Sequence, residues 1–507
     1  MSMLDWLDEQ LGRITMHSLV LYGLIALSAM ALLLMAVGNL DYNPLQFVLS
    51  TALLGCVSYG ANKLFGWLFG LRPHSESAWI TALILALLFT PPTTLIGFVK
   101  LALVAVIAMA SKYVIAPRGR HMFNPAAIAI VIASIGGIAY AGWWVATAAM
   151  VPLMFIVGFL ILRRTKKYYV ALLFVLVAVV SLLLRGTDIV TALVSWPLLF
   201  VAAIMLTEPL TLPPRAWQQY VVAATVGLLM TLPLHYGRVT MTPALALVIG
   251  NVIGWWFGKR RAIKLRYVGK KQMNSTVYEF TFDTDKLQFE PGQYIELSLI
   301  HPKSDLRGHR RIFSIVGSSG SEQLSIGTKI PTKPSSYKRA LMNIKPGTTL
   351  YATRVAGDFV LPDDPNVPIV CIAGGIGVTP FVSFCMATDR KMKLIYGVSS
   401  VQELSFVQQL RHSANDVTVV SQNRGPLPDA EWKFAEGSLD SEILSGLIDV
   451  PTQPIVYISG PPAMVASTRR IVKALGVRRV RVDEFAGYEY TKWHEDYWDR
   501  SRSGQTG

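Results

Sequence analysis

The chain has 507 residues with a formal net charge of +15, and 52% of its residues are hydrophobic while only 16% are charged. This composition excludes a wholly soluble protein, and the charged, turn-rich character of the residues after Phe257 excludes one embedded entirely in a membrane. Three scattered cysteines exclude a disulfide scaffold, a structural zinc ribbon and a cysteine-ligated iron–sulfur centre, and we expect no metal site.

The first half of the chain contains ten apolar segments, and a helix needs about 20 residues to cross a bilayer. We expect a transmembrane bundle of about ten helices over residues 18–258, preceded by a retained N-terminal segment over residues 1–17 that has no signal-peptide cleavage site. The segments are 18–37, 45–69, 77–90, 94–112, 124–141, 143–162, 169–184, 189–206, 218–234 and 242–258.

The loops between these segments differ in positive charge. Alternate loops and the exit after Phe257 hold about fifteen Lys and Arg residues, whereas the opposite set holds about three. This asymmetry predicts a multi-pass protein of the cell inner (cytoplasmic) membrane with both termini and the C-terminal half in the cytoplasm. It also accounts for much of the basic excess, so we expect the lipid bilayer, and no nucleic acid, as a partner.

Two polar loops interrupt the apolar half. In one, Arg120 and Asn124 precede a proline that opens a helix, where exposed N–H groups favour anions. In the other, Thr207 and Glu208 stand where a segment ends. We take these four residues as candidate cofactor contacts. The alternative is that they are helix caps and orientation signals in a bundle that serves only as an anchor.

At these residues the chain resembles the membrane subunits of the sodium-pumping NADH:quinone reductase and Rnf complexes, the NqrB/RnfD group. The resemblance rests on F-N-P-A-A (residues 123–127) and T-E-P-L-T (residues 207–211) in a setting of ten apolar segments. It implies FMN or riboflavin in the membrane domain. The threonine sequence to which that family often attaches FMN is not found, because Thr147 and Thr191 match it poorly, so covalent attachment is not supported.

After residue 262 short alternating runs replace the apolar segments. Six predicted strands indicate a small antiparallel barrel over residues 263–361. From residue 365 to residue 488, strands alternate with helices, which favours a parallel sheet. The remaining residues, 489–507, are a polar tail.

Two glycine clusters follow predicted strands of the parallel sheet. Gly374, Gly375 and Gly377 lie between a buried strand and a helix that begins near Thr379 and Pro380. Glycines there let backbone N–H groups approach a pyrophosphate. The second cluster, Ser459-Gly460-Pro461, ends another strand, and ligands bind where strand carboxyl ends converge. The alternative is two ordinary strand-to-helix turns.

The barrel carries Arg311-Ile312-Phe313-Ser314 on a predicted strand. Arg311 and Phe313 share one face of that strand and Ser314 faces the other way. A guanidinium suits a diphosphate, an aromatic ring can cover a flavin, and a hydroxyl can bind a ring nitrogen.

Together these residues resemble the ferredoxin–NADP reductase family over about residues 263–488. The resemblance implies that Arg311 holds the FAD pyrophosphate, Phe313 packs on the isoalloxazine and Ser314 faces the flavin N5, with Thr379 nearest the nicotinamide. Phe485 resembles the C-terminal aromatic that shields the flavin, which makes Ser314, Thr379 and Phe485 the expected catalytic residues. The second FAD phosphate contact is expected at Gly327, Thr328, Lys329, Ser335 and Ser336.

The pyridine nucleotide is either NADH or NADPH. Residues 396–400, after the second sheet strand, offer hydroxyls but no Lys or Arg for a 2′-phosphate, which favours NADH slightly, although Arg424 could reverse this preference.

These features predict a membrane flavoprotein that passes electrons from cytoplasmic NAD(P)H, through FAD and a membrane-domain flavin, to a quinone or an extracytoplasmic flavoprotein or similar carrier. In one alternative the helices only anchor a cytosolic reductase. In the other they form a redox-driven cation, or sodium, translocating unit.

Overall fold

A computed structural model describes residues 7, 10–11, 14–69, 75–116, 122–209, 211–237, 239–257, 263–301, 309–413 and 416–485. The chain divides into two compact units, Met1–Arg261 and Ala262–Gly507, and each is treated by itself. Arg120, the tail 489–507 and most of segment 1–17 lie outside the described residues.

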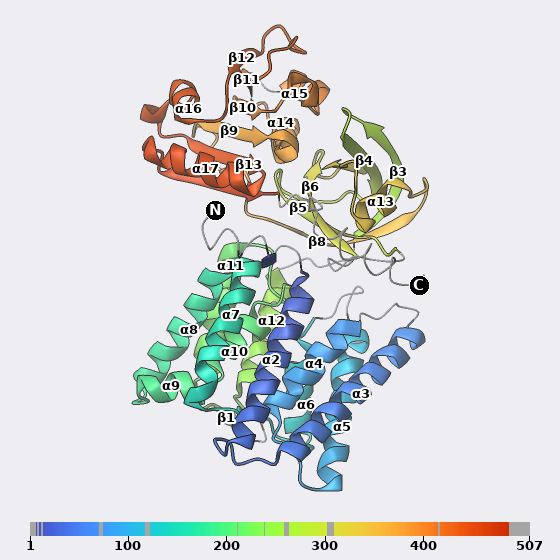
Figure 1. Ribbon diagram of the computed structural model, residues 1–507, viewed down its shortest axis with the longest axis vertical. Coiled ribbons are helices and arrows are strands. Elements are labelled where there is room, and N and C mark those ends of the chain that lie inside the picture. The colour runs from blue at the N-terminus through green and yellow to red at the C-terminus, as the bar shows by residue number, and fades with distance from the viewer. Residues whose placement is uncertain are drawn as a thin grey trace, which may run out of the picture. The chain divides into compact units, whose positions relative to one another are not determined.

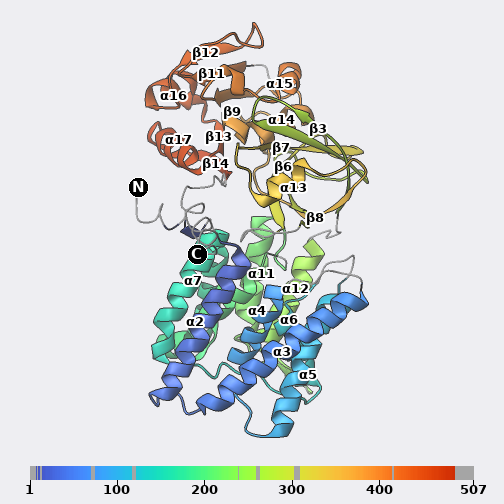
Figure 2. The ribbon, with the colours of Figure 1, turned by 45° about the vertical axis from the view of Figure 1, so that its right-hand side comes forward.

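The first unit is helical, and a helix occupies part of each of the ten predicted segments. Within it α3 lies beside α5, and α8 beside α11 (Figures 1 and 2). The helices are α2 (Met16–Ala36), α3 (Pro44–Leu68), α4 (Ser75–Leu88), α5 (Leu95–Val114), α6 (Pro125–Ile135), η2 (Ala148–Met150), α7 (Val151–Thr165), α8 (Tyr168–Leu183), α9 (Ile189–Ser195), α10 (Leu198–Phe200), η3 (Val201–Leu206), α11 (Ala216–Leu229) and α12 (Pro243–Phe257).

Not all of these helices are long enough to cross a membrane. In the described residues, four helical stretches have the length and apolar character required: Met16–Ala36, Pro44–Leu68, Leu95–Val114 and Ala148–Thr165. A fifth candidate is the pair Ile189–Ser195 and Leu198–Leu206, which is bent by 56°. The helices therefore lie where the apolar pattern predicted them. That the chain crosses a membrane ten times stays a prediction, and so does its location in a membrane.

Three predicted segments differ from continuous helices. Segment 124–141 is helical only to Ile135, where Gly136 and Gly137 follow and Gly137 takes a positive φ of 64°. Segment 143–162 becomes helical only at Ala148. Segment 189–206 breaks at Pro197, which has no N–H to continue the hydrogen-bond ladder. A short hairpin, β1 (His235–Tyr236) with β2 (Val239–Thr240), joins α11 to α12.

The second unit begins with the predicted antiparallel barrel. Its six strands close in the order β3-β4-β7-β6-β5-β8 around a core that includes Phe280, Phe282 and Tyr337. The strands are β3 (Ile263–Gln272), β4 (Val277–Thr284), β5 (Tyr294–Ser298), β6 (Arg310–Val316), β7 (Gln323–Lys329) and β8 (Thr349–Ala356), with the short helix α13 (Ser336–Met342) between β7 and β8.

The predicted parallel sheet is also present and has six strands, ordered β12-β11-β10-β9-β13-β14. Helices cover both of its faces (Figure 1): α14 and α15 share one apolar core, and α16 and α17 the other. The elements are β9 (Ile369–Gly374), η4 (Gly375–Val378), α14 (Thr379–Ala387), β10 (Lys393–Gly397), η5 (Val401–Glu403), α15 (Val407–Ser413), β11 (Asp416–Ser421), β12 (Lys433–Glu436), α16 (Ser441–Leu447), η6 (Val450–Thr452), β13 (Ile455–Gly460), α17 (Pro462–Ala474) and β14 (Arg479–Glu484).

Residues 401–413 carry a helical pattern in the sequence, but they do not form a single helix. The chain turns at Phe406, which has a φ of +58°, so that only residues 407–413 form an α-helix. The fully buried Phe406 ring lies in the core beneath the sheet, and this burial stabilises the unusual backbone. The edge strands β12 and β14 were not predicted.

Candidate functional site

The two glycine clusters meet at one edge of the parallel sheet. β9 and β13 are neighbours, and the chain order of the strands reverses between them. A Cβ added to Gly377 would lie 2.3 Å from the carbonyl oxygen of Ser459, and one added to Gly374 would lie 2.3 Å from Sδ of Met464. A side chain at Gly377 would therefore separate the two loops, whereas one at Gly374 would first displace the flexible end of Met464. This reversal point is where open α/β sheets bind nucleotides.

The loop after β9 leads directly into α14. Gly375 has a positive φ of 52°, and a Cβ added to it would meet no atom within 4 Å. Thr379 begins α14, is 2% exposed and donates its hydroxyl to the carbonyl of Ile376 at 3.1 Å. Pro380 follows in the first turn of α14, where a missing N–H costs nothing. The turn is therefore preformed next to the reversal point.

Phe485 is brought to the same edge. Its backbone N–H donates to the carbonyl of Gly460 at 2.9 Å, immediately after β14. Pro461, which follows Gly460, is exposed at the start of α17. The described part of the chain thus unites Gly374, Gly377, Ser459, Gly460 and Phe485 at one sheet edge.

On the barrel, β6 presents the predicted flavin motif with the expected alternation at its start. Arg311 and Phe313 are each 8% exposed, whereas Ile312 between them is 53% exposed. The Arg311 guanidinium lies 5.0 Å from the centroid of the Tyr337 ring, and Phe313 packs 6.1 Å from that ring within the barrel core. Arg311 also donates to the carbonyl of Arg310 at 2.7 Å. Stacking of Phe313 on a flavin stays a prediction.

Ser314 differs from its neighbours in its hydrogen bonding. Its side chain is 4% exposed, and among the described residues its Oγ has no hydrogen-bond partner. Ser459 is fully buried, and its Oγ likewise has no hydrogen-bond partner among the described residues. A buried hydroxyl without a partner costs about 1–3 kcal/mol. A flavin ring nitrogen opposite Ser314 would supply that partner, so this residue fits the predicted FAD.

The barrel and the sheet touch at Gly327. A Cβ added to Gly327 would lie 2.8 Å from Cγ2 of Thr379 and 2.8 Å from Cζ of Phe406. Ser383 on α14 donates to the carbonyl of Gly317 at 3.2 Å, which joins the same two parts. The predicted FAD strand β7 and the predicted nicotinamide residue Thr379 therefore lie in contact.

The predicted second phosphate contact lies around the start of α13. Ser335 caps this helix by accepting the N–H of Lys338 at 3.3 Å, and Ser336 shares a hydrogen bond of 3.1 Å with Nε2 of His301. Thr328 is buried and Lys329 is exposed. His301 was not identified from the sequence.

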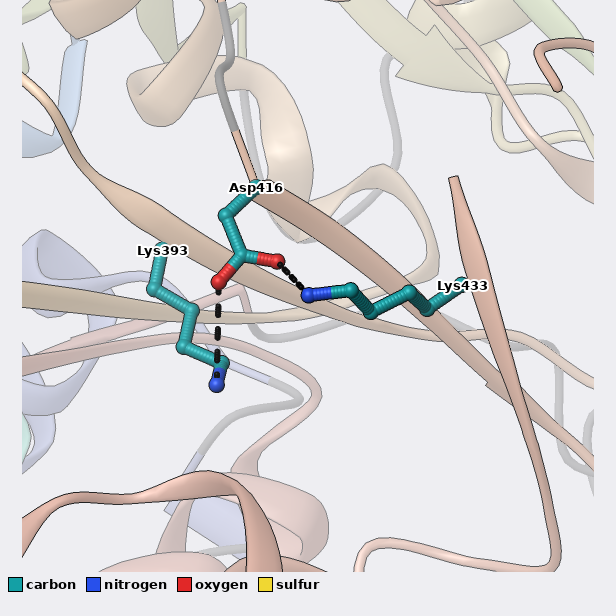
Figure 3. Close-up of polar contacts among 3 residues, drawn as sticks. All are labelled: Lys393, Asp416 and Lys433. Carbon is teal, nitrogen blue, oxygen red and sulfur yellow. Dashed lines mark hydrogen bonds and ion pairs between the residues drawn. The ribbon is translucent and has the colours of Figure 1, made fainter. Parts of the chain in front are cut away.

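The cations of the sheet bear on the choice of nucleotide. Figure 3 shows Asp416 between Lys393 and Lys433, at distances of 3.7 and 3.0 Å. All three stand at the amino ends of β10, β11 and β12, opposite the glycine loops, so this group does not reach the reversal point. Arg424 lies 5.8 Å from the Phe434 ring, and Asn423 Nδ2 donates to the carbonyl of Ser399 at 3.1 Å.

The two polar loops of the helical unit also meet. Asn124 Nδ2 donates to Glu208 Oε2 at 3.0 Å, and the Asn124 backbone N–H donates to Oδ1 of Asn251 at 2.8 Å. Oδ1 of Asn124 caps α6 by accepting the N–H groups of Ala126 and Ala127. The buried Thr207 hydroxyl donates back to the carbonyl of Ala203 at 2.8 Å. Asn124 therefore links α6, α12 and the end of η3.

Asn251 is a functional candidate that sequence reasoning missed. It is the polar residue within the apolar stretch 243–257, and that signal could have identified it. Phe406 carries no sequence signal, because its role depends on contact between segments distant in the chain. Arg120 lies outside the described residues.

Residues 371–470 match the family model described as an oxidoreductase NAD-binding domain. The flavohemoprotein of Burkholderia sp. (strain TH2) is 27% identical over 233 residues, which are 44% of this chain and 58% of that protein. The flavohemoprotein of Bacillus subtilis (strain 168) is 26% identical over 199 residues, covering 37% and 49%. The chain thus spans about half the length of the curated relatives it matches.

Among solved structures, the FAD/NAD-binding domain of nitric oxide dioxygenase from Vibrio cholerae O1 biovar El Tor is 21% identical. The match covers 44% of this chain and 98% of that one, with a TM-score of 0.38. The family model supports an oxidoreductase NAD-binding domain within the α/β region predicted for the C-terminal half. The resemblance of the helical half to the NqrB/RnfD group stays a prediction.

Proposed function

We propose that this chain is an NAD(P)H-dependent, FAD-containing oxidoreductase whose helical half passes the electrons through a membrane to a quinone or an extracytoplasmic carrier. The contact of Gly327 with Thr379 carries the first part of the proposal, because it joins the flavin strand to the nucleotide loop. The match of residues 371–470 to an oxidoreductase NAD-binding domain supports it.

The chemistry divides between the bound groups and the chain. FAD, when bound, accepts a hydride and releases its electrons singly. The chain's own residues bind and orient: Arg311 supplies positive charge for the pyrophosphate and Ser314 donates a hydrogen bond to the ring. The loop from Gly374 to Thr379 would hold the nucleotide at the reversal point, and Phe485 would cover the flavin ring.

The second part of the proposal concerns the helical half. A hydrocarbon core about 30 Å thick separates the cytoplasm from an outer acceptor. Electrons therefore need a carrier inside it, for which we propose FMN or riboflavin without a covalent link. Asn124, Thr207 and Glu208 lie together where η3 ends and α6 begins, and this group of residues supports a cofactor site there.

The first experiment is to purify the full chain in detergent, precipitate it with acid, and quantify FAD and FMN in supernatant and pellet. FAD together with a second flavin supports the electron path and excludes a simple anchor. FAD alone, at one per chain, contradicts the membrane flavin and leaves the anchor or direct quinone reduction. Turnover that depends on sodium in sealed vesicles would favour the cation-translocating alternative.

A steady-state comparison addresses the pyridine nucleotide. We expect a higher kcat/KM for NADH than for NADPH, because the loop after β10 has hydroxyls but no cation and Arg424 lies against Phe434. A preference for NADPH that Arg424→Ala removes would show that Arg424 binds the 2′-phosphate.

A further inference from the structure

The turn between β3 and β4 connects the barrel to a short segment of the sheet region. We call this segment, residues 403–406, the strap; it follows β10 and precedes α15. In the turn, Nδ2 of Asn274 donates to the carbonyl of Glu403 at 2.8 Å and to Oγ of Ser405 at 2.9 Å. Both bonds are partly buried, and they join residues 129 and 131 positions apart in the chain. They therefore fix the strap to the barrel.

The Asn274 side chain has a second set of hydrogen bonds, to its own turn. Its Oδ1 accepts the backbone N–H groups of Thr276 at 3.0 Å and Val277 at 2.9 Å. An asparagine side chain has two protons to donate and an oxygen that accepts two bonds. Asn274 uses both protons on the strap and its oxygen on the turn, so the two tasks are divided between the two ends of one amide.

The strap ends in a residue with a strained backbone. Phe406 has a φ of +58°, a conformation that bulky side chains rarely adopt and that persists only where the surrounding contacts hold it. Ser405, just before it, is 2% exposed, and its backbone N–H donates to the hydroxyl of the buried Tyr396 at 3.3 Å. Asn274 holds the same serine from the barrel side. The conformation of Phe406 therefore depends on the bonds made to Ser405.

The Phe406 ring lies where the barrel meets the nucleotide loop. A Cβ added to Gly327 would lie 2.9 Å from Cε2 of Phe406 and 2.8 Å from Cγ2 of Thr379. Phe406 and Thr379 therefore press on the same face of Gly327. All three side-chain positions are tightly packed, so a displaced Phe406 ring would leave room for Thr379 to move.

We propose that Asn274 is a positioning residue for hydride transfer. It holds Ser405, and thereby keeps the Phe406 ring against Gly327 and limits the movement of Thr379. The inference rests on the proposed function, in which Thr379 lies nearest the nicotinamide. Asn274 neither gains nor loses a proton in the reaction; it affects only the alignment of the nicotinamide with the flavin, to which the rate is sensitive.

Asn274→Asp separates the two tasks of this side chain. The aspartate keeps an oxygen for the N–H groups of the turn, but its second oxygen has no proton for the Glu403 carbonyl and repels it. In the FAD-loaded full-length protein, we expect NADH to reduce the flavin about tenfold more slowly, with the Kd for NADH changed by less than about twofold. Ser275→Asp is the matched control, because it puts the same charge on the neighbouring, exposed residue of the turn. It should behave as the wild type does.

Anaerobic stopped-flow absorbance measures the rate and the Kd, and hydrogen–deuterium exchange reports on the strap without turnover. The amides of residues 403–406 should exchange faster in Asn274→Asp than in the wild type or in Ser275→Asp. Phe406→Leu tests whether Asn274 acts through the ring. Adding Asn274→Asp to Phe406→Leu should slow reduction by less than about twofold further, because the contact that Asn274 supports is already lost.

The outcomes distinguish this inference from the proposed function. A wild-type flavin that neither NADH nor NADPH reduces would overturn both. If the wild type is reduced and Asn274→Asp is reduced at the same rate, the positioning role alone is wrong, even where the strap exchanges faster. Full additivity of the two substitutions would also overturn it, because Asn274 would then not act through Phe406.

Discussion

Gly327 of the barrel faces Thr379 of the nucleotide loop so closely that a Cβ on the glycine would lie 2.8 Å from the threonine Cγ2. The two residues are separated by more than fifty positions in the chain, and each belongs to a different cofactor half-site in the proposed function. Hydride transfer is sensitive to the position of the nicotinamide, so we expect this contact to affect the alignment on which the proposed reaction depends.

Gly327→Ala should therefore slow reduction of the flavin by NADH by about 10- to 100-fold in the FAD-loaded protein. The added methyl group must displace Thr379 and Phe406, and both are buried. Anaerobic stopped-flow absorbance measures the rate. Gly269→Ala is the matched control on the barrel, because a Cβ there meets nothing within 4 Å. Equal rates for both variants would contradict the alignment role.

Ser314→Ala should slow flavin reduction about tenfold or more without destabilising the flavin-free protein. Its hydroxyl is buried and has no hydrogen-bond partner among the described residues. Burying such a hydroxyl destabilises the folded protein, so its removal should not lower the free energy of unfolding. Ser459→Ala removes another buried hydroxyl of the same kind and serves as the comparison. Stopped-flow reduction and thermal unfolding measure the two effects. A large loss of thermal stability in Ser314→Ala would show that the hydroxyl has a structural partner.

Asn124→Ala should destabilise the helical unit more than Asn43→Ala. Both asparagines cap a helix that begins with proline, and losing a cap costs about 1 kcal/mol. Asn124 also bonds to Glu208 and Asn251, whereas the described bonds of Asn43 are its exposed capping contacts. Urea denaturation in detergent measures the difference. Equal midpoints would mean that these cross-links contribute nothing.

The Cys385 thiol should resist alkylation in the folded protein. Burial raises its pKa from 9.0 to about 12, so the reactive thiolate is scarce at neutral pH. Since the pKa is raised on folding, the stability linked to it is complete below about pH 9 and decreases as the pH rises toward 12. The test uses Cys56→Ala, which removes the exposed cysteine, with iodoacetamide and mass spectrometry. Modification below pH 9 without urea would contradict the burial.

The sequence alone determined the division into halves, the helix positions, the barrel and most of the parallel sheet. These features depend on local patterns: long apolar segments, alternation along strands such as 310–316, and glycines after buried strands. The boundaries of residues 401–413 and 124–141 could not be predicted in the same way. They depend on burial of Phe406 and on the glycine turn after Ile135.

Only the tertiary structure decided which residues meet. Asn124 and Glu208 are 84 positions apart, and their hydrogen bond depends on the packing of α6 against the end of η3. The contact of Gly377 with Ser459 likewise depends on β9 and β13 being neighbours, a pairing that the order of strands along the chain does not specify. Helices and strands can be predicted from the sequence because they depend on the pattern of residues close together in the chain. The sites cannot, because they are formed by contacts between distant segments, and these contacts depend on how the whole core packs.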